Sequence, residues 1–278
     1  GLLKAMIKLA KQKKAEVKAG KQVASAAGPG GVLTSFVGGI QELTDATVRD
    51  LRGNVQTGSA VTSLKPVSGG WQLELADGGT FDADIVVSAA PAHILKSLVE
   101  PFDAALSELL AGIPYAPMNV ICFGYEREKI ARDLDGFGYL IPKKAGCAIL
   151  GTLWDSSIFP QRAPEGHVLL RSMMGGATNP AAIELSDAEV RERTMAELQK
   201  IMGIEAEPDF VRIFRHQPAI PQYVVGHADR LVAIEDQLTH HHGLILTGTA
   251  FFGVGLNDCV NAANQAGEQV VSCLEKTD

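Results

Sequence analysis

Apolar residues recur at two different periods along the chain, and the helical period marks five segments. Residues 36–51, FVGGIQELTDATVRDL, begin with a Gly-Gly turn and carry apolar residues at helical spacing from Ile40 to Leu51. The strongest helical pattern covers residues 186–202, where Ser186 and Glu189 have the spacing of a capping box. We expect further helices near residues 91–99, 102–111 and 227–240.

Strict alternation predicts a β-hairpin in residues 71–92, WQLELADGGTFDADIVVSAAPA. Its apolar residues Trp71, Leu73 and Leu75 alternate with polar ones, and Asp77–Gly79 supply the turn. The continuous apolar run at 85–87 predicts a buried strand after the hairpin.

From Met118 the pattern changes to short β-like runs separated by glycine, proline and charged turns. The runs are MNVICFGYE, GFGYLIP, CAILGTLWD and HVLLRSMMGG, and PDFVRIFRH adds another strand further on. Such runs are typical of an antiparallel sheet. The predicted fold class is therefore α+β or α/β, with an antiparallel sheet, helices and a closing strand–turn–helix unit.

The closing unit is GLILTGTAFFGVGLNDCVNAANQAGEQVV, residues 243–271. Gly253 and Gly255 would allow a backbone to approach a ligand closely, and Asn257 or Asp258 could cap the helix. A turn of this kind aims backbone N–H groups and a helix dipole at an anion. Taken alone the pattern is weak, because glycines in such turns often serve tight packing.

Composition narrows the class of protein. The chain has 278 residues, 46% of them hydrophobic, and a net charge of −7, which argues against general nucleic-acid binding. Residues 1–21 hold seven lysines and one acid, a local charge of +6, so the remainder carries −13. The basic amphipathic segment 2–17, LLKAMIKLAKQKKAEV, predicts a helix that packs on its own domain or, alternatively, contacts anionic lipid or a partner.

Common hydrolytic and metal motifs do not occur. The sequence has no GxSxG, HExxH or Walker pattern, and its four cysteines have no ligand spacing and suggest reduced thiols of a cytosolic protein. The histidines at 240–242 fall in a turn, where a solvated loop is a better interpretation than a metal site. We expect no metal site, identify no catalytic acid or base, and find no apolar stretch of transmembrane length and no signal peptide.

Several stretches together resemble the flavin-dependent protoporphyrinogen oxidases of the oxygen-dependent heme pathway. They occur in the family's order and cover nearly the whole chain: GGIQELTDA, ADIVVSAAPAHI, GFGYLIP, ILGTLWDSSIFPQRAPEG, LLRSMMGG, AIPQYVVGH and GLILTGTAFFGVGLNDC. The resemblance implies a flavin amine oxidase-like fold whose FAD-binding domain is interrupted by a substrate domain.

One family feature is missing. Members begin with a strand–GxGxxG–helix unit that binds FAD, and this chain shows none. The resemblance therefore implies a C-terminal fragment of a longer enzyme, without bound FAD and inactive by itself. It divides the chain into a helical part of the substrate domain (1–35), a returning FAD-domain segment (36–95), the substrate domain (96–225) and the closing FAD-domain unit (226–278).

The resemblance also assigns residues. The closing turn, Gly253, Val254, Gly255 and Leu256, would contact the flavin and pyrophosphate through backbone groups, and Val61 would lie against the adenine end. A flat reduced tetrapyrrole would occupy an apolar slot lined by Phe137, Gly138, Tyr139, Leu140, Leu150, Gly151 and Met173. Plain core packing is the alternative for Leu140, Leu150 and Met173. Arg171 and Arg215 have no assigned role.

The implied reaction is dehydrogenation of protoporphyrinogen IX to protoporphyrin IX. A hydride would leave a bridging carbon for the flavin, a pyrrole N–H proton would be lost, and oxygen would reoxidise the flavin over three rounds. The open alternatives are coproporphyrinogen III as substrate, another flavin amine oxidase-like activity, and a non-catalytic binding or membrane-docking module. Peripheral contact with the inner face of the cell membrane and a homodimer are further expectations.

Overall fold

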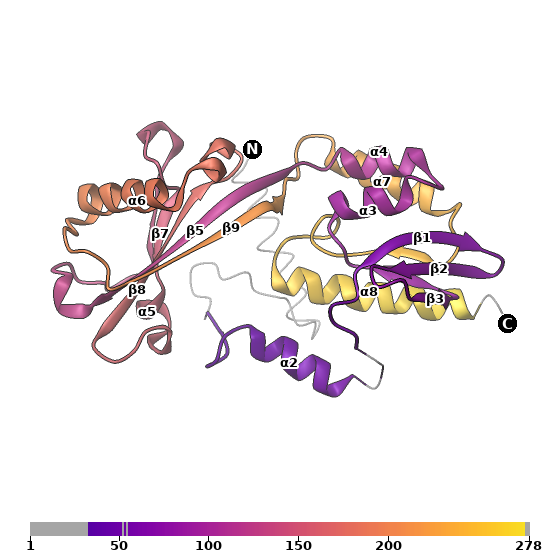
Figure 1. Cartoon of the computed structure of the whole chain (residues 1–278), viewed down its shortest axis with the longest axis horizontal. Helices are drawn as coiled ribbons and strands as arrows, with labels where there is room; N and C mark the ends of the chain where they lie inside the picture. The colour runs from indigo at the N-terminus through magenta and orange to yellow at the C-terminus, as the bar shows by residue number, and fades with distance from the viewer. Residues whose placement is uncertain (1–32, 52, 54, 276–278) are drawn as a thin grey trace, which may run out of the picture. The chain divides into compact units, whose positions relative to one another are not determined.

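The protein is described here by a computed structural model, which covers residues 33–51, 53 and 55–275 (Figure 1). The chain divides into two compact units, residues 1–58 and 59–278. The predicted basic helix 2–17 and the segment 1–35 fall almost entirely outside the described residues. No described helix is long and apolar enough to cross a membrane.

The first unit contains helix α2, Gln41–Asp50. It lies inside the predicted segment 36–51, so the helix is confirmed, and its first residues follow a turn at Gly39 with a positive φ of 100°. None of its residues is buried, and Ile40, Val48 and Leu51 are each about half exposed. The predicted apolar stripe therefore exists without a covering partner among the described residues.

The second unit contains two hydrophobic cores. The first core holds a three-stranded antiparallel sheet in the order β1-β2-β3, formed by Val61–Val67, Gly70–Leu75 and Thr80–Ala83. A two-stranded parallel sheet pairs β4 (Val86–Ser88) with β10 (Leu244–Leu246). Helices α3 (Ala92–Val99), α4 (Ala104–Ala111), α7 (His227–Leu238) and α8 (Leu256–Leu274) complete this part. The predicted hairpin and four predicted helices are thus confirmed.

Trp71 anchors the first core. Only 2% of its surface is exposed, and its indole N–H donates to the carbonyl of His242, 3.0 Å away. Leu95 and Leu110, from α3 and α4, pack into the same cluster as Leu246 of β10. The predicted domain boundary at residue 95 stays a prediction, and this shared core favours a boundary nearer residue 113. The predicted burial of the strand at 85–87 is wrong at Val87, which is 44% exposed at the face of a small sheet.

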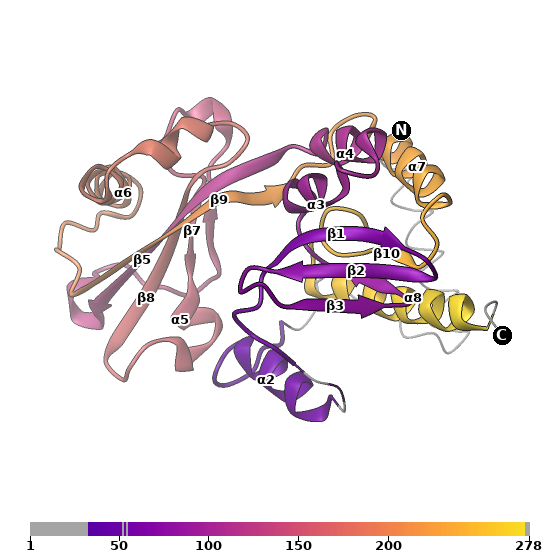
Figure 2. The ribbon, with the colours of Figure 1, turned by 45° about the vertical axis from the view of Figure 1, so that its right-hand side comes forward.

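The second core lies beside a five-stranded antiparallel sheet. Its order is β6-β7-β8-β5-β9, and the strands span Gly138–Leu140, Gly151–Trp154, His167–Gly175, Tyr115–Glu126 and Phe210–Pro221. Figures 1 and 2 show β5 and β9 as one long ribbon that continues toward the first core. The predicted antiparallel sheet is confirmed.

Helix α6, Asp187–Met202, packs on one face of this sheet. Ser186 and Glu189 form the predicted capping box, with the Glu189 carboxylate accepting from the Ser186 N–H at 2.8 Å. Val190 and Leu198 are fully buried against Ile121 and Phe123 of β5. In the part of β5 that lies in this core, Ile121, Phe123 and Tyr125 therefore face α6, and Val120, Cys122 and Gly124 point to the opposite side.

The short elements lie in the connections. They are α5 (Asp155–Ile158) and four 3-10 turns, at Arg127–Lys129, Lys143–Ala145, Pro160–Arg162 and Pro180–Glu184.

Candidate active site

The face of the five-stranded sheet opposite α6 collects most of the predicted substrate residues. We call it the open face and define it by side chains that share one side of the strands through the pairing register. They are Gly138 and Leu140 on β6, Gly151 and Leu153 on β7, Leu169, Arg171 and Met173 on β8, Val120 and Cys122 on β5, and Arg212 and Phe214 on β9. Of these, only Gly151 is buried.

Three of the predicted substrate residues form one row across this face. Leu140 pairs with Gly151, and Gly151 pairs with Met173, so the side chains of Leu140 and Met173 point to the same side of the sheet, with Gly151 between them. Leu140 is 78% exposed, which is high for a leucine with a plain packing role. Because Gly151 has no side chain, it leaves a shallow depression between Leu140 and Met173.

Glycine is required at position 138. Its φ is +120°, and a Cβ there would lie 2.0 Å from the carbonyl oxygen of Thr152 on β7. β6 can therefore approach β7 only with glycine at this point. The neighbouring Phe137 is 62% exposed, and its carbonyl accepts from the Trp154 N–H at 3.0 Å.

Two other predicted residues contribute differently. The Tyr139 side chain belongs to the α6 core, where its hydroxyl accepts from Thr152 Oγ1 at 3.1 Å, so the ring does not line the open face. Burial raises the pKa of Tyr139. Leu150 donates its N–H to the Met173 carbonyl at 2.7 Å and holds the start of β7 against β8.

The two arginines without an assigned role are both paired. Arg171 lies on the open face and donates two hydrogen bonds to Asp155, of 2.9 and 2.8 Å, an interaction that raises the pKa of Arg171. Arg215 points to the α6 side, where it bonds Asp187 at 2.6 Å and the Ile183 carbonyl at 2.8 Å.

The closing turn brings together the predicted cofactor residues 253–256. Gly253 has a φ of +113°, and α8 begins at Leu256. The Gly253 N–H donates to the Tyr223 hydroxyl at 2.8 Å, and the Gly255 N–H donates to Asp258 Oδ2 at 3.1 Å. Asp258 therefore serves the helix start, as predicted, while Asn257 lies inside α8.

The N–H groups of residues 253 and 255 thus already donate hydrogen bonds within the protein. The N–H groups of residues 254 and 256 lie between and after them along the turn. Within the described part of the chain, no hydrogen bond from the N–H groups of Val254 and Leu256 is recorded. The Asp258 carboxylate makes this helix start less favourable for a pyrophosphate than a bare N-terminus would be. The turn better fits a neutral acceptor, such as the carbonyl oxygens and ring nitrogens of a flavin. Val61 lies apart, at the start of β1, where it pairs with Leu75.

Sequence reasoning missed Tyr223, which holds the turn from outside it. Its hydroxyl donates to the Thr249 carbonyl at 2.6 Å, and its ring stacks on His227 at 4.2 Å between centroids. The residue stands in the AIPQY stretch, so its position was visible in the sequence, but its contact with residue 253 was not.

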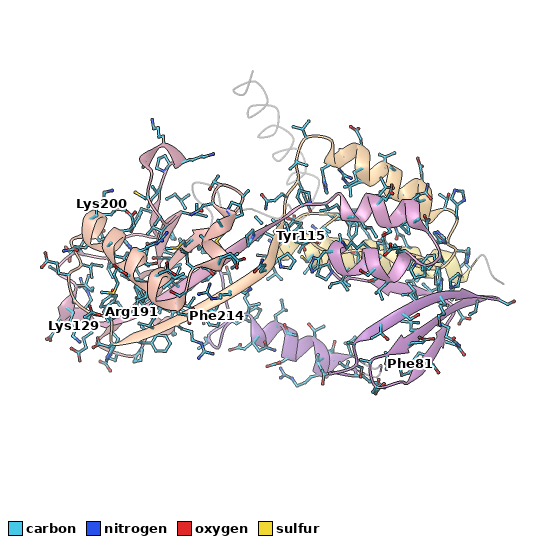
Figure 3. All side chains as sticks on the ribbon, turned by 45° about the horizontal axis from the view of Figure 1, so that its top comes forward. Phe81, Tyr115, Lys129, Arg191, Lys200 and Phe214 are labelled. Atoms are coloured by element: carbon cyan, nitrogen blue, oxygen red, sulfur yellow. The ribbon has the colours of Figure 1, made fainter. Side chains whose placement is uncertain are left out.

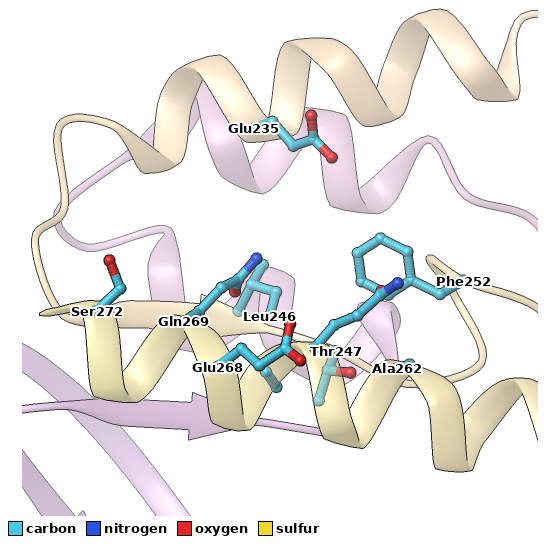
Figure 4. A pocket seen from close by; sticks show the side chains of 10 residues that line it. Glu235, Leu246, Thr247, Phe252, Ala262, Glu268, Gln269 and Ser272 are labelled. Atoms are coloured by element: carbon cyan, nitrogen blue, oxygen red, sulfur yellow. The ribbon is translucent and has the colours of Figure 1, made fainter.

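A cavity of about 430 Å³ lies between α7, β10 and α8 (Figure 4). Glu235 and Glu268 both line it, and the side-chain oxygen of Thr247 is buried there without a hydrogen-bond partner in the described structure. Two carboxylates disfavour a phosphate group. This cavity is therefore a poor candidate for the anionic part of a cofactor.

Of the histidines at 240–242, His240 and His242 are exposed, as predicted, whereas His241 is not. His241 lies 2.7 Å from the Asp103 carboxylate through its Nε2 atom, and only 13% of its side chain is exposed. The interpretation as a solvated loop is thus wrong for His241, because its ring packs beside Asp103, the N-cap of α4. Among the residues that the structure describes, no group of three or more His, Cys, Asp or Glu side chains could hold a metal ion.

Comparison with known proteins defines the class. The model of the flavin-containing amine oxidoreductases matches residues 3–271, and the chain belongs to this family. The family is described as flavin-containing. Its curated relatives include several enzymes named as porphyrinogen oxidases.

Two curated relatives and one solved structure illustrate these similarities. Coproporphyrinogen III oxidase of Bacillus subtilis is 30% identical, over 85% of this chain and 50% of its own length. Chloroplastic protoporphyrinogen oxidase of Oryza sativa is 32% identical, over 89% and 49%. A crystal structure from Exiguobacterium sp. 255-15, provisionally named a protoporphyrinogen oxidase, has a TM-score of 0.78 at 26% identity, and covers 89% of this chain and 54% of that one. The chain spans about half the length of the curated relatives that it matches.

Proposed function

We propose that this chain forms the substrate-binding and closing part of an FAD-dependent enzyme that oxidises protoporphyrinogen IX to protoporphyrin IX, with oxygen as the final acceptor. The observation that carries the proposal is the row Leu140–Gly151–Met173 on a solvent-accessible apolar sheet face. A flat, largely apolar ring system matches such a face. The printed names of the relatives support the same substrate class.

The chain's own residues bind and orient in this proposal. The side chains of Leu140 and Met173, with the backbone of Gly138 and Gly151, hold the tetrapyrrole, and Leu150 and Phe137 support the strand ends. Val254 and Leu256 offer N–H groups to the flavin, Gly253 and Gly255 shape the turn, and Val61 contacts the adenine end. Bound FAD would supply the hydride acceptor. No acid or base in the described residues is assigned to the chemical step.

Coproporphyrinogen III is the second candidate substrate, because the Bacillus subtilis relative carries that name at 30% identity. The two substrates differ in their number of carboxylate arms. The groups that bind those arms would therefore decide between them.

We also propose that the 278-residue chain by itself neither retains FAD nor turns over substrate. Within the described residues its parallel sheet has two strands, β4 and β10, whereas parallel sheets are normally larger and covered on both faces. The rest of a flavin site would have to come from outside the described residues. An absorption spectrum of the purified chain with nearly one equivalent of flavin would contradict this proposal.

The basic segment supports one further proposal, peripheral contact with an anionic membrane, since residues 1–21 carry a charge of +6. Flotation with anionic vesicles, repeated after reversing the charge of Lys8, Lys11 and Lys14, tests it. We also propose that the protein forms a homodimer, which the molar mass from light scattering would test.

The decisive experiment is turnover of both porphyrinogens by the product of the complete gene, followed by porphyrin fluorescence. Leu140→Ala should raise KM for the preferred substrate several-fold without unfolding the protein, because its side chain is 78% exposed. Arg191→Gln on α6, across the sheet, is the matched control. Failure to oxidise either porphyrinogen would refute the proposed function.

A further inference from the structure

We propose that Arg212 and Phe214 on β9 form a subsite for a carboxylate arm of the ligand on the open face. The inference rests on the proposed function, because the occupant is a porphyrin-type molecule with carboxylate substituents. No role for either residue follows from the sequence motifs.

The register extends the predicted slot to β9. Met173 pairs with Val120, and Val120 pairs with Phe214, so the row Leu140–Gly151–Met173 continues across two more strands. Neighbouring strands lie about 4.8 Å apart, so the row is about 19 Å wide from β6 to β9. Phe214 is 44% exposed and gives the row an aromatic end (Figure 3).

Arg212 lies on the same face, two residues from Phe214 along β9. Its guanidinium carbon is 5.6 Å from the Phe214 ring centroid, a cation–π distance that holds the charge beside the apolar row. Cys122 pairs with both Arg212 and Arg171, so the two arginines share the next row across the sheet.

The two arginines differ in how their charge is compensated. Arg171 is neutralised by its bidentate pair with Asp155. No ion pair between Arg212 and a described acidic residue is recorded, and the residue is exposed. A guanidinium that forms no ion pair with a described carboxylate, next to an apolar surface, matches a carboxylate on an apolar ring.

The alternative role for Arg212 is protection of an edge strand, since charged residues on edge strands prevent pairing with other molecules. That role needs only a charge that stays in solvent. A ligand subsite needs a response that depends on the ligand's carboxylate, and this difference defines the experiment.

The test titrates the 278-residue chain with mesoporphyrin, which has two carboxylates, and with its uncharged dimethyl ester, by fluorescence quenching. Wild type should bind the acid more tightly than the ester. Arg212→Gln should weaken binding of the acid about tenfold, about the value of one charge-assisted hydrogen bond, and leave the ester unchanged. Arg212→Lys should recover part of the loss, and Phe214→Leu should weaken both ligands.

Arg191→Gln serves as the control, because it removes the same charge from α6 on the other side of the sheet, where Arg191 pairs with Glu207. An equal effect of Arg212→Gln and Arg191→Gln, or an unchanged preference for the acid in Arg212→Gln, would overturn the subsite alone. If the wild-type chain bound neither porphyrin, the open face would not be a porphyrin site, and the proposed function of this face would fall with the subsite.

Discussion

The amide nitrogen of Gly253 lies 2.8 Å from the hydroxyl oxygen of Tyr223, and this contact fixes the closing turn from the segment between β9 and α7. The same hydroxyl donates its proton to the Thr249 carbonyl. Burial raises the pKa of Tyr223, which further favours the protonated hydroxyl. One side chain thus ties two points of the turn for which we propose a contact with the flavin.

Tyr223→Phe should loosen this turn without removing the ring stack on His227. The Gly253 N–H would lose its acceptor, at a cost of about 1 kcal/mol in the free energy of unfolding. Hydrogen exchange of the Gly253 amide in the isolated chain should accelerate, and flavin affinity of the product of the complete gene should fall. Hydrogen exchange thus reports the stability of the turn itself, independently of flavin binding.

Tyr115→Phe is the matched control for this prediction. The Tyr115 hydroxyl also accepts one backbone N–H, from Ala92 at 2.9 Å, at the start of α3. Its removal should affect exchange at residue 92 and leave residue 253 protected. Unchanged exchange at Gly253 in Tyr223→Phe would show that the hydroxyl does not hold the turn.

Gly253→Ala should disturb the same turn by a different route. The φ of +113° disfavours any side chain, and a Cβ would lie 2.6 Å from Asp258 Oδ2. We expect a loss of about 1–3 kcal/mol in the free energy of unfolding, measured in urea. Gly78→Ala is the control, because its φ of +86° carries a similar backbone cost while nothing lies within 4 Å. If the two variants lost equal stability, the contact with Asp258 would have no effect.

Local signals predicted the elements of this fold well. The capping box at Ser186 and Glu189 fixes the start of α6 within a few neighbouring residues, and the alternation around Trp71 fixes the hairpin. Both patterns depend on residues that are close together in the sequence. They therefore survive in the sequence without knowledge of what packs against them.

Pairings between distant strands were not predictable in the same way. Phe214 joins the row of Met173 only because β5 lies between β8 and β9, and no short motif encodes that order. A shift of one residue in register would place Phe214 and Arg212 on the α6 side. The resemblance indicated Leu140 and Met173, whereas the β9 residues needed the sheet itself.

Asp103 should prove important for the first core through two separate contacts. Its Oδ1 accepts the Leu106 N–H at 2.8 Å as the N-cap of α4, and its Oδ2 contacts His241. Asp103→Ala should lower the free energy of unfolding by about 1–2 kcal/mol. Asp103→Ser can restore the cap without the histidine contact, so it should recover part of the loss. Recovery of all the stability by Ser would mean that the contact with His241 contributes nothing.

The charge state of Asp103 also gives this region a pH dependence on the acid side. Burial acts to raise its pKa, but the Leu106 N–H and His241 outweigh burial and lower the pKa below 3.8. The folded state therefore releases this proton more readily than the unfolded state. The stabilisation is complete above the unfolded pKa and is lost as the pH falls through the lowered folded pKa. The free energies of unfolding of wild type and Asp103→Ser, measured in urea, should differ at pH 7 and converge at low pH.

His227 should produce a second loss of stability, near neutral pH. It is buried, and neither ring nitrogen has a hydrogen-bond partner in the described structure. Burial, followed by the charge of Arg230, lowers its pKa below 6.5. The unfolded chain takes up this proton more readily than the folded chain does. The free energy of unfolding is therefore highest above about pH 6.5, and it falls as the pH decreases from there to the lowered pKa of the folded state. Burial lowers the pKa of His93 too, so that residue adds to the same loss.

His227→Phe should reduce this pH dependence while keeping a ring against Tyr223. The measurement is the free energy of unfolding at pH 7.5 and 5.5, from urea titrations of wild type and variant. The exposed His167 provides the control, since His167→Gln should leave the difference between the two pH values as it is in wild type. An equally large difference in His227→Phe would place the proton uptake at another group. Because the ring of His227 supports Tyr223, wild-type protection of the Gly253 amide should decline over the same pH interval, whereas in His227→Phe it should hold.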